Sequence, residues 1–505
     1  MRGQLVAPVP LDLDRNSPIG LTRQLVSGLR RLMDEGRLTR GDALPSSRAL
    51  AARLELSRGT VVAAYDQLQA EGYLVAASGS GTRVAADAHV GAPAATGKRP
   101  DAGIACSPAT ASRRDEASHG GPPRGDSRGH DGSGSPRPGP GASSASIVDL
   151  RPGTPDVSAI VSPPWRRAWR DAAAHPDTQT DPLGLPALRI EIAEHLRLMR
   201  SLVRPSKQIL VTSGTREGLA LLLASLRSHS GRVLVGIERP GHPALSGVPL
   251  AMGLGTLPLP TDEQGLVTTA LPLGEHRPDV LVVTPSHQYP HGGWLSLERR
   301  QELLAWARRT GTLIVEDDYD SELRYVGMPL PALATLDDAE NGCVVLLGTF
   351  STVLTPAVAT GYLVAPNRLV ADLASYRRAT GLPAPAMVQQ ALAGYLASGE
   401  LRRHIQRMRR GYRQRRALIL AELGHVPAVQ LAPLSGGLHA VVNTAAPGMT
   451  VIARLAGENI LVGDLGEYWG PHSPDVHGIV FGFGSVPPET LSRVLPIIAA
   501  CCSMP

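Results

Sequence analysis

The sequence predicts two folded regions joined by a long polar segment: a small α+β module at the N-terminus and a large α/β body at the C-terminus. Residues 1–86 show helical periodicity over short distances, whereas residues 87–147 are crowded with Gly, Pro, Ser, Asp and Arg. From residue 148 onward, apolar runs of strand length alternate with longer helical patterns. This alternation indicates a parallel sheet covered by helices on both faces. We therefore divide the chain into residues 1–86, 87–147 and 148–505.

The composition limits the class of protein. The chain has 505 residues, 43% of them hydrophobic, and a net charge of +5, which is compatible with an anionic partner. Its four cysteines show no metal-ligand spacing, so we expect neither a zinc site nor a disulfide framework, and a reducing compartment fits best. The N-terminus has no apolar signal region, and no run approaches the roughly 20 residues that span a bilayer. We expect a cytoplasmic protein that makes no membrane contact.

The body is expected to contain a central sheet and a smaller second part. Helical patterns at 215–227 and 297–309 separate several of the apolar runs, and a long helical stretch covers 385–423. The mixed segment that follows predicts a smaller α+β subdomain. The expected strands are 209–211, 233–236, 280–284, 312–316, 344–347 and 361–364.

The segment 87–147 has almost no large apolar side chains. It cannot bury enough surface to offset the entropy of ordering, so we expect a disordered linker. As a flexible coil of about 60 residues, its root-mean-square span would be roughly 40–45 Å.

Two serines predict the starts of two short helices in the N-terminal module. Ser46 and Ser57 each precede a helical pattern, which is the preferred position of an N-cap residue. In the second helix Val61, Tyr65 and Leu68 follow the spacing i, i+4, i+7, so these three side chains should face the core.

The first turn of the second helix is expected to be exposed. Arg58 and Thr60 lie in this turn, where a recognition helix meets base edges and phosphates. The later segment 78–84, Ser-Gly-Ser-Gly-Thr-Arg-Val, predicts a tight β-hairpin. Its glycines, Gly81 among them, would allow a close approach to a sugar–phosphate backbone.

Together these features resemble the GntR-type winged helix-turn-helix over about residues 15–86. The shared motifs are G-x-L-x-x-G-x-x-L-P-S-x-R, S-R-x-T-V, A-Y-x-x-L-x-x-E-G and G-S-G-T. The resemblance implies that Arg48, Arg58, Thr60 and Gly81 contact double-stranded DNA, and phosphate contacts would make the binding salt-dependent. The alternative is a small three-helix domain with a solvated basic face.

Several motifs of the body resemble one enzyme fold. Residues 211–216 read Val-Thr-Ser-Gly-Thr-Arg and join a strand to a helix start, a common phosphate cradle. Residues 284–292 and 316–322 resemble T-P-S-H-Q-x-P-T-G and E-D-D-Y-D-S-E. The body is similar to the fold type I aminotransferases, which use pyridoxal phosphate (PLP), and to the MocR regulators that fuse this fold to a GntR-type module.

The resemblance implies a role for each residue of a cofactor site. Asp317 would pair with the pyridinium nitrogen and keep the ring protonated, and Tyr319 would face the ring hydroxyl. His242 stands where the family has a Tyr that stacks on the ring. The cofactor-binding residues implied are Gly214, Thr215, His242, Asp317, Tyr319, Thr349, Ser351 and Thr352.

The sequence departs from the family at the reactive end of this site. Thr352 stands where the Schiff-base lysine would be, and the chain has only two lysines, Lys98 and Lys207. Ala359 replaces the phosphate-binding arginine, a loss of about 1.5–3 kcal/mol of charge-assisted contact. Residues 477–484 also lack an arginine for a substrate carboxylate. We therefore assign no catalytic residue and no metal ligand, and we expect PLP binding to be weakened or absent, and non-covalent at most.

These observations predict a MocR-like transcriptional regulator whose body serves as a dimerisation and sensor module. The expected partners are DNA, a second copy of the chain and a small effector, namely PLP, an amino acid or their adduct. Two alternatives remain open: a PLP-dependent aminotransferase with an appended DNA-binding domain, and a regulator that senses a ligand unrelated to PLP. The acidic cluster at 316–322 leaves a bound cation open as well. The Arg-rich helix at 402–416 is either a second DNA surface or, preferentially, a structural connector.

Overall fold

The computed structural model describes two parts of the chain, the N-terminal module and the body. The predicted linker lies outside the described residues, apart from Ile147. The described residues are 9–15, 21–34, 37–39, 41–70, 73–77, 81–84, 147–158, 160–177, 181–326, 330–381, 384–470 and 476–504.

The N-terminal module consists of three helices and a β-hairpin. Its elements are α1 (Leu21–Asp34), α2 (Ser47–Arg53), α3 (Arg58–Ala70), β1 (Leu74–Ala77) and β2 (Gly81–Val84). The two strands pair antiparallel, with Ala77 opposite Gly81. The expected hairpin is therefore present, while its turn at 78–80 lies outside the described residues.

Local chemistry explains where the helices α2 and α3 begin. The Ser46 Oγ atom accepts a hydrogen bond of 3.2 Å from the Ala49 N–H, and the Ser57 Oγ atom accepts one of 3.1 Å from the Thr60 N–H. Each bond satisfies one of the N–H groups that a helix start leaves free. The structure confirms both predicted caps. It also confirms that Val61, Tyr65 and Leu68 are buried in the core of the module.

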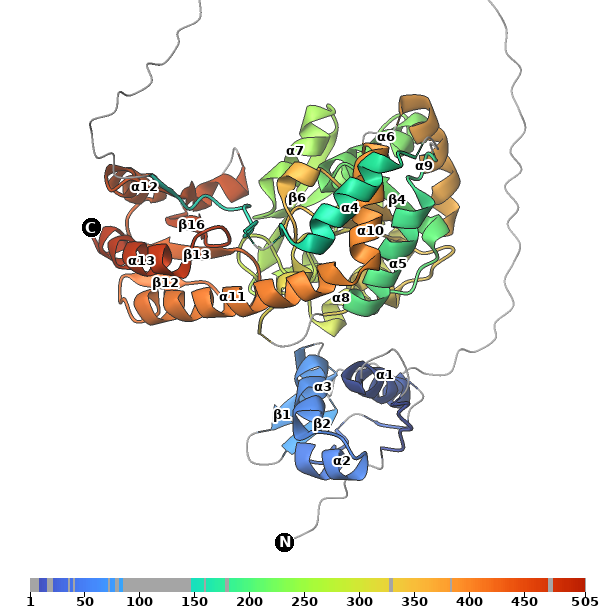
Figure 1. Ribbon diagram of the computed structural model, residues 1–505, viewed down its shortest axis with the longest axis horizontal. Coiled ribbons are helices and arrows are strands. Elements are labelled where there is room, and N and C mark those ends of the chain that lie inside the picture. The colour runs from blue at the N-terminus through green and yellow to red at the C-terminus, as the bar shows by residue number, and fades with distance from the viewer. Residues whose placement is uncertain are drawn as a thin grey trace, which may run out of the picture. The chain divides into compact units, whose positions relative to one another are not determined.

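The body is built on an eight-stranded sheet in the order β4-β11-β10-β9-β8-β5-β6-β7 (Figure 1). The central strands from β10 to β6 are parallel, as expected. The strands are β4 (Ile209–Thr212), β5 (Leu234–Arg239), β6 (Gly255–Asp262), β7 (Gly265–Leu266), β8 (Val280–Val283), β9 (Leu313–Asp318), β10 (Val344–Thr349) and β11 (Gly361–Val364).

Two details of the sheet correct the sequence-based prediction. Strand β11 runs antiparallel to both of its neighbours, so the sheet is mixed. Strand β6 was not predicted, because its sequence Gly-Thr-Leu-Pro-Leu-Pro-Thr-Asp is half exposed and carries two prolines. The six strands that were expected lie within about three residues of their observed ends, since their apolar runs are buried on both faces.

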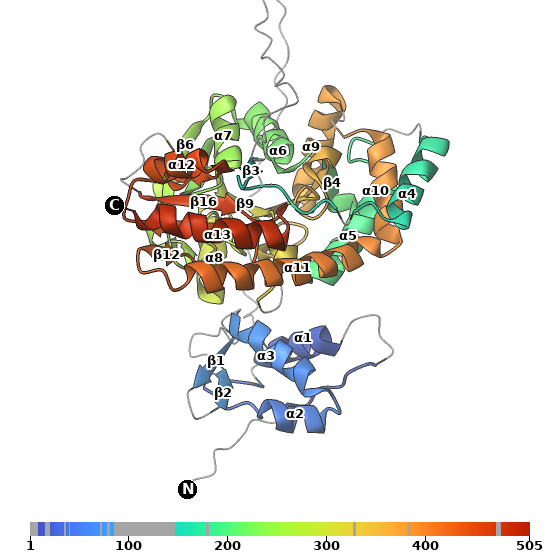
Figure 2. The ribbon, with the colours of Figure 1, turned by 60° about the vertical axis from the view of Figure 1, so that its left-hand side comes forward.

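Helices cover both faces of this sheet (Figures 1 and 2). Apolar side chains on one face of the sheet pack in one core cluster with α6, and those on the other face pack in a second cluster with α5 and α8. The helices of the large part are α4 (Pro163–Ala174), α5 (Pro186–Arg200), α6 (Thr215–Ser230), α7 (Pro243–Ala251), α8 (Leu297–Thr310), α9 (Asn367–Thr380) and α10 (Ala386–Ala397).

The long helical stretch predicted at 385–423 is divided in two. Helix α10 ends at Ala397, and α11 (Glu400–Leu423) begins after Gly399, whose φ of 72° lies in the left-handed region. Glycine adopts this conformation without the steric cost that a side chain imposes, so it breaks the helical path.

The C-terminal residues form the smaller α+β subdomain that the sequence predicts. A four-stranded sheet in the order β12-β13-β16-β15 packs with α12 (Gly448–Gly457) and α13 (Pro488–Ser503). Its strands are β12 (Val429–Leu431), β13 (His439–Thr444), β15 (Gly463–Asp464) and β16 (Gly478–Gly482). The start of the body joins this subdomain, because β3 (Val148–Asp149) pairs in parallel with β14 (Ile460–Leu461).

Helix α11 connects the two parts of the body (Figure 2). The Arg409 guanidinium donates a hydrogen bond of 2.5 Å to the Glu322 carbonyl of the large part. Arg415 donates to the Val486 carbonyl of the small part at 2.8 Å and pairs with Asp156 at 3.0 Å. These arginines make their bonds inside the body, which favours the connector over the second DNA surface. Among the described helices, none combines the length and apolarity of a membrane span.

Candidate functional site

The predicted DNA-binding residues lie at the helix starts and the hairpin of the N-terminal module. Arg48 in the first turn of α2 and Arg58 at the start of α3 are both exposed. Thr60 is partly exposed, and its hydroxyl lies 2.8 Å from that of Ser57. Gly81 opens strand β2. Two arginines and a helix start exposed on one small module provide the donors that phosphates and base edges accept.

The body contains a cavity of about 410 Å³ at the carboxyl edge of the large sheet, next to the small subdomain. In open α/β sheets this edge is the usual place for a ligand. It is lined by the start of α6, the cap of α7, the ends of β9 and β10 with the loop that follows β10, and the start of β13. The lining residues are Gly153, Ser213, Gly214, Thr215, Arg216, His242, Ala244, Tyr289, Tyr319, Asp320, Thr349, Ser351, Thr352, Pro356, Ala359, Leu438 and His439.

Seven of the eight predicted cofactor residues line this one cavity, although they come from segments more than 100 residues apart. The eighth, Asp317, lies at the end of β9, two residues before Tyr319. The structure thus brings the predicted set together at one edge of the sheet.

One end of the cavity is formed by the start of α6. Gly214 is the N-cap, and no side chain caps this helix start. The Glu217 carboxylate accepts a hydrogen bond of 3.1 Å from the Ser213 N–H, outside the helix proper. The first helical N–H groups therefore have no acceptor within the helix, and the helix dipole favours an anion at this point. The hydroxyls of Thr349 and Ser351, 3.1 Å apart, line the same cavity.

Asp317 is a buried carboxyl group that has no partner. It is 3% exposed, and neither of its oxygens accepts a hydrogen bond from any described residue. Burial raises its pKa well above the ordinary value, and the carboxylates of Asp318, Asp320 and Glu238 raise it further. A buried carboxyl without a donor is costly, and a ligand that supplies an N–H group at this position would reduce that cost.

The neighbouring Asp318 differs from Asp317 because it has a cation beside it. The Asp318 carboxylate lies 2.7 Å from the Nε atom of Arg200, which is 1% exposed. Successive side chains of a strand point to opposite faces, so Asp318 meets its cation on one face of the sheet, whereas Asp317 faces the other. The fold therefore provides a partner for one carboxylate of this pair and leaves the other open.

His242 contributes an uncharged ring to the cavity. Its ring centroid lies 4.6 Å from that of Tyr289 at an interplanar angle of 34°. Burial lowers the pKa of His242 to about 4, and the positive charge of Arg216 acts in the same direction. The ring is therefore neutral at pH 7 and can stack on another aromatic ring. Its Nδ1 atom has no partner among the described residues.

Tyr319 and Thr352 are bound to other parts of the chain. The Tyr319 hydroxyl donates to the His287 carbonyl at 3.0 Å and lies 2.9 Å from the His287 Nδ1 atom. The Thr352 hydroxyl donates a hydrogen bond of 2.6 Å to the Tyr319 carbonyl. Thr352 therefore anchors its loop to the end of β9 with a neutral hydrogen bond.

No described residue that lines the cavity is a lysine. Lys207 is exposed and precedes β4, whereas the cavity begins after the other end of that strand. Lys98 lies outside the described residues. Ala359, which also lines the cavity, contributes only a methyl group. The helix start, His242 and Asp317 are the groups that could hold a phosphorylated pyridine ring, and none of them provides an amine to bind it covalently.

Sequence reasoning missed Arg216. This arginine is the second residue of α6, it is exposed, and it lines the same cavity as Gly214 and Ala359. Its position directly after Ser-Gly-Thr was visible in the sequence, but a basic side chain at a helix start has no obvious meaning until the cavity is known.

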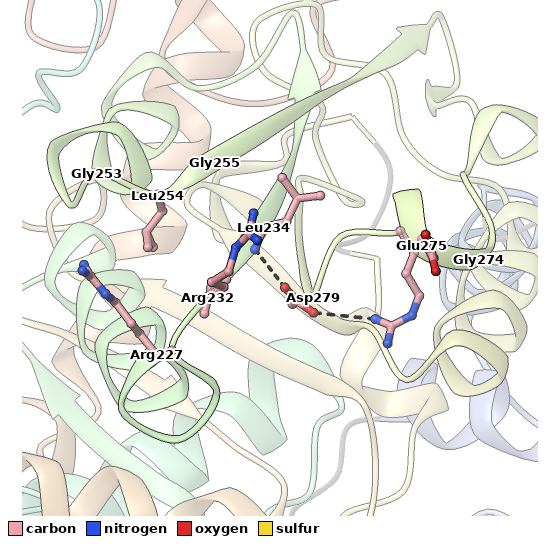
Figure 3. Close-up of a pocket in the computed structure, with 12 residues that line it drawn as sticks. Arg227, Arg232, Leu234, Gly253, Leu254, Gly255, Gly274, Glu275 and Asp279 are labelled. Atoms are coloured by element: carbon pink, nitrogen blue, oxygen red, sulfur yellow. Dashed lines mark hydrogen bonds and ion pairs between the residues drawn. The ribbon is translucent and has the colours of Figure 1, made fainter.

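A second cavity, of about 720 Å³, lies at the opposite edge of the sheet, where β5, β6 and β8 begin (Figure 3). Here Asp279 accepts a hydrogen bond of 2.9 Å from the Leu234 N–H and lies 3.7 Å from Arg277. Arg227, near the end of α6, donates to the Met252 carbonyl at 3.1 Å. Asp279 and Arg227 are thus paired with other groups of this cavity or with the backbone, in contrast to Asp317.

Comparisons with known proteins agree with both parts of the structure. Residues 21–84 match the family of bacterial regulatory proteins named gntR, and residues 146–465 match aminotransferase class I and II. Among solved structures, LysN, an α-aminoadipate aminotransferase from Thermus thermophilus, has a TM-score of 0.63 and 22% identity. The match covers 70% of this chain and 92% of that one. The protein is thus a DNA-binding transcriptional regulator with a body of the fold type I aminotransferase kind.

Two relatives have the same architecture along nearly their whole length. The pyridoxine biosynthesis transcriptional regulator PdxR of Corynebacterium glutamicum is 45% identical over 99% of this chain and 100% of its own. The probable rhizopine catabolism regulatory protein MocR of Rhizobium meliloti is 31% identical over 95% of this chain and 93% of its own. The chain belongs to the MocR-type family of transcriptional regulators.

Proposed function

We propose that this regulator binds a ligand of the pyridoxal phosphate class in the cavity of its body, without a covalent bond, and changes its DNA binding in response. The unpartnered, buried carboxyl of Asp317 is the observation that carries this proposal. A protonated pyridine nitrogen is a cationic donor that would lower the pKa of Asp317 and remove the cost of burying it. A body that served only as a structural scaffold would gain no stability from a buried carboxyl group without a partner.

The remaining cofactor residues fit the parts of that ligand. Gly214 and Thr215, at the start of α6, would receive the phosphate, together with the hydroxyls of Thr349 and Ser351. The neutral ring of His242 would stack on the pyridine. Bound pyridoxal phosphate supplies an electron-withdrawing ring, but the chain's own residues hold it here by position and charge only.

We also propose a target for the regulation. The 45% identity to PdxR extends over both the DNA-binding module and the body, so the genes of pyridoxine biosynthesis are the first candidates. A regulator of that pathway would sense its product class, in agreement with the fit of the cavity.

We also propose that the domain boundaries lie at residues 86 and 147.

The DNA contacts are proposed at Arg48, Arg58, Thr60 and Gly81, on the exposed helix starts and hairpin of the module. We propose that the protein acts as a homodimer, so that two modules meet paired half-sites of an operator. Sedimentation of the purified chain tests this: a mass near 53 kDa at micromolar concentration would contradict the dimer.

A mobility-shift experiment tests the coupling between cavity and DNA. Operator fragments are first selected by the wild-type protein from a random-sequence pool and then titrated with protein, with and without pyridoxal phosphate. We expect the ligand to shift the DNA affinity severalfold in the wild type. A shift of equal size in Asp317→Asn would contradict the site, and specific DNA binding without any shift would favour a ligand unrelated to PLP.

A further inference from the structure

We propose that Arg216 is the cation for the phosphate of the ligand, in place of the arginine that Ala359 has replaced. This inference deepens the proposed function and rests on it, since it concerns the same cavity and the same class of ligand. It assigns a phosphate-binding residue to a site for which the family resemblance indicated only the loss of an arginine.

The location of Arg216 is the first argument. It follows Gly214 and Thr215 directly and lines the same cavity as Ser351 and Ala359. The charge of Arg216 contributes to the low pKa of His242, so its guanidinium acts on the residue that would stack on the ring. An anion bound at the start of α6 would therefore lie between the free N–H groups of the helix and this cation.

The second argument is energetic. A basic side chain in the first turn of a helix opposes the helix dipole, so this placement of Arg216 is unfavourable on its own. Glu217, the only acidic residue in the first turn of α6, pairs instead with Arg377 at 2.7 Å. Arg216 makes no hydrogen bond or ion pair with any described residue. An anion bound between the helix start and Arg216 turns this unfavourable placement into a favourable one.

The third argument is that a second group near this cavity lacks a partner. Asp317 lies two residues before Tyr319, which lines the cavity, and its carboxyl group has no donor among the described residues. The pyridinium nitrogen and the phosphate of one ligand carry opposite charges, so an unpaired carboxyl group and an unpaired guanidinium both suit this ligand. The arrangement predicts that the phosphate contributes strongly to affinity, although the site has lost one of the family's contacts.

Two ligands that differ only in the phosphate isolate this contribution. Pyridoxamine 5′-phosphate and pyridoxamine carry no aldehyde, so neither reacts with Lys98, Lys207 or the amino terminus. Their affinities for the full-length protein are measured by calorimetry. We expect the phosphate to strengthen binding by about 10-fold or more in the wild type, since hydrogen bonds to charged groups contribute about 1.5–3 kcal/mol.

Arg216→Gln tests the residue, and Arg227→Gln is the matched control at the far end of the same helix, in the cavity of Figure 3. The phosphate advantage is the ratio of the affinity for pyridoxamine 5′-phosphate to the affinity for pyridoxamine. We expect Arg216→Gln to abolish most of this advantage, while the affinity for pyridoxamine stays within about twofold. Arg227→Gln should change neither the advantage nor the affinity for pyridoxamine. Adding Ala359→Arg to Arg216→Gln should restore the advantage, which a merely structural role would not allow.

The outcomes separate this inference from the proposed function. An unchanged phosphate advantage in Arg216→Gln would overturn the role of Arg216 and leave the ligand class standing. No saturable binding of either compound to the wild type would overturn the proposed function itself. Equal losses for both compounds in Arg216→Gln would show a general structural effect and would also contradict the inference.

Discussion

The N-terminal module and the body differ in where their proposed functional residues lie. In the module, the side chains proposed to act lie on the surface, and the buried residues only support them: Arg48 and Arg58 are exposed above a core that includes Val61 and Leu68. In the body, the most informative group, Asp317, is buried and lacks a partner. The comparison teaches that the surface residues of the module bear no folding cost, whereas the burial of Asp317 has a cost that a cationic ligand would reduce.

The strongest test of the module side of this comparison is Arg58→Ala. We expect the affinity for a selected operator to fall by about 100-fold or more, because an arginine contact contributes about 1–3 kcal/mol and occurs twice in a dimer. Unfolding of the protein should be unchanged, since Arg58 is exposed. Arg31→Ala, which removes the same charge from the end of α1, is the control for a mobility-shift assay. Equal losses in both variants would leave Arg58 without a specific role.

The strongest test of the body side is Thr352→Lys. A lysine at this position lines the cavity, so we expect the variant to retain pyridoxal phosphate through gel filtration and to gain a visible Schiff-base absorbance that hydroxylamine removes. Thr352→Arg is the matched control, because it introduces a cation that forms no Schiff base. The same absorbance in the wild type, or none in Thr352→Lys, would show that the cavity does not place the ligand as we describe.

Asp317→Asn should change both the affinity for the ligand and the pH dependence of stability. Loss of the charged acceptor is expected to weaken pyridoxamine 5′-phosphate by about 10- to 100-fold. The pKa of Asp317 is raised on folding, so the folded state holds a proton that the unfolded state releases as the pH rises above about 4. The contribution of Asp317 to stability therefore falls with rising pH until its folded pKa is passed.

The Asp317→Asn variant cannot ionise at this position, so the decline in melting temperature between pH 5 and pH 9 should become smaller than in the wild type. Differential scanning calorimetry over this range measures it. A decline of the same steepness in Asp317→Asn would mean that the carboxyl is already compensated in the free protein, contrary to its isolation in the structure.

His242→Tyr is expected to have the smallest effect. The family has a tyrosine here, and the larger ring should strengthen ligand binding by about 2- to 10-fold, from roughly 0.5–1.5 kcal/mol of aromatic contact. The wild-type affinity should not change between pH 6 and pH 8 on account of His242, because its pKa is about 4. Fluorescence titration of both proteins checks this, and a weaker His242→Tyr would mean that the ring does not stack on the ligand.

Much of the fold was predictable because its signals are local. The strands that end at Thr212 and Thr349 begin with unbroken apolar runs, and the serine caps at Ser46 and Ser57 mark helix starts by their own chemistry. Strand β6 was not predictable in this way, since its two prolines and alternating exposure disguise it. The break before α11 depends on one glycine with positive φ, which the helical pattern around it concealed.

The candidate site was predictable as a set of motifs but not as an electrostatic arrangement. Resemblance gave the identity of Asp317, while its lack of any partner follows only from the packing around it. Likewise, the role proposed for Arg216 became apparent only from the fold, because Arg216 lines the same cavity as Ala359, which lies far along the chain. The sequence predicted a threonine in place of the lysine at Thr352, whereas the hydrogen bond from the Thr352 hydroxyl to the Tyr319 carbonyl is evident only in the folded chain.

The most direct test of the central claim is a calorimetric titration of pyridoxal phosphate into the full-length wild-type protein, followed by gel filtration and an absorbance spectrum. We predict saturable binding with one ligand per chain, complete release on gel filtration, and no absorbance that hydroxylamine removes. Absence of saturable binding, or a ligand that stays attached to the unfolded chain, would contradict a body that holds this class of ligand by charge and stacking alone.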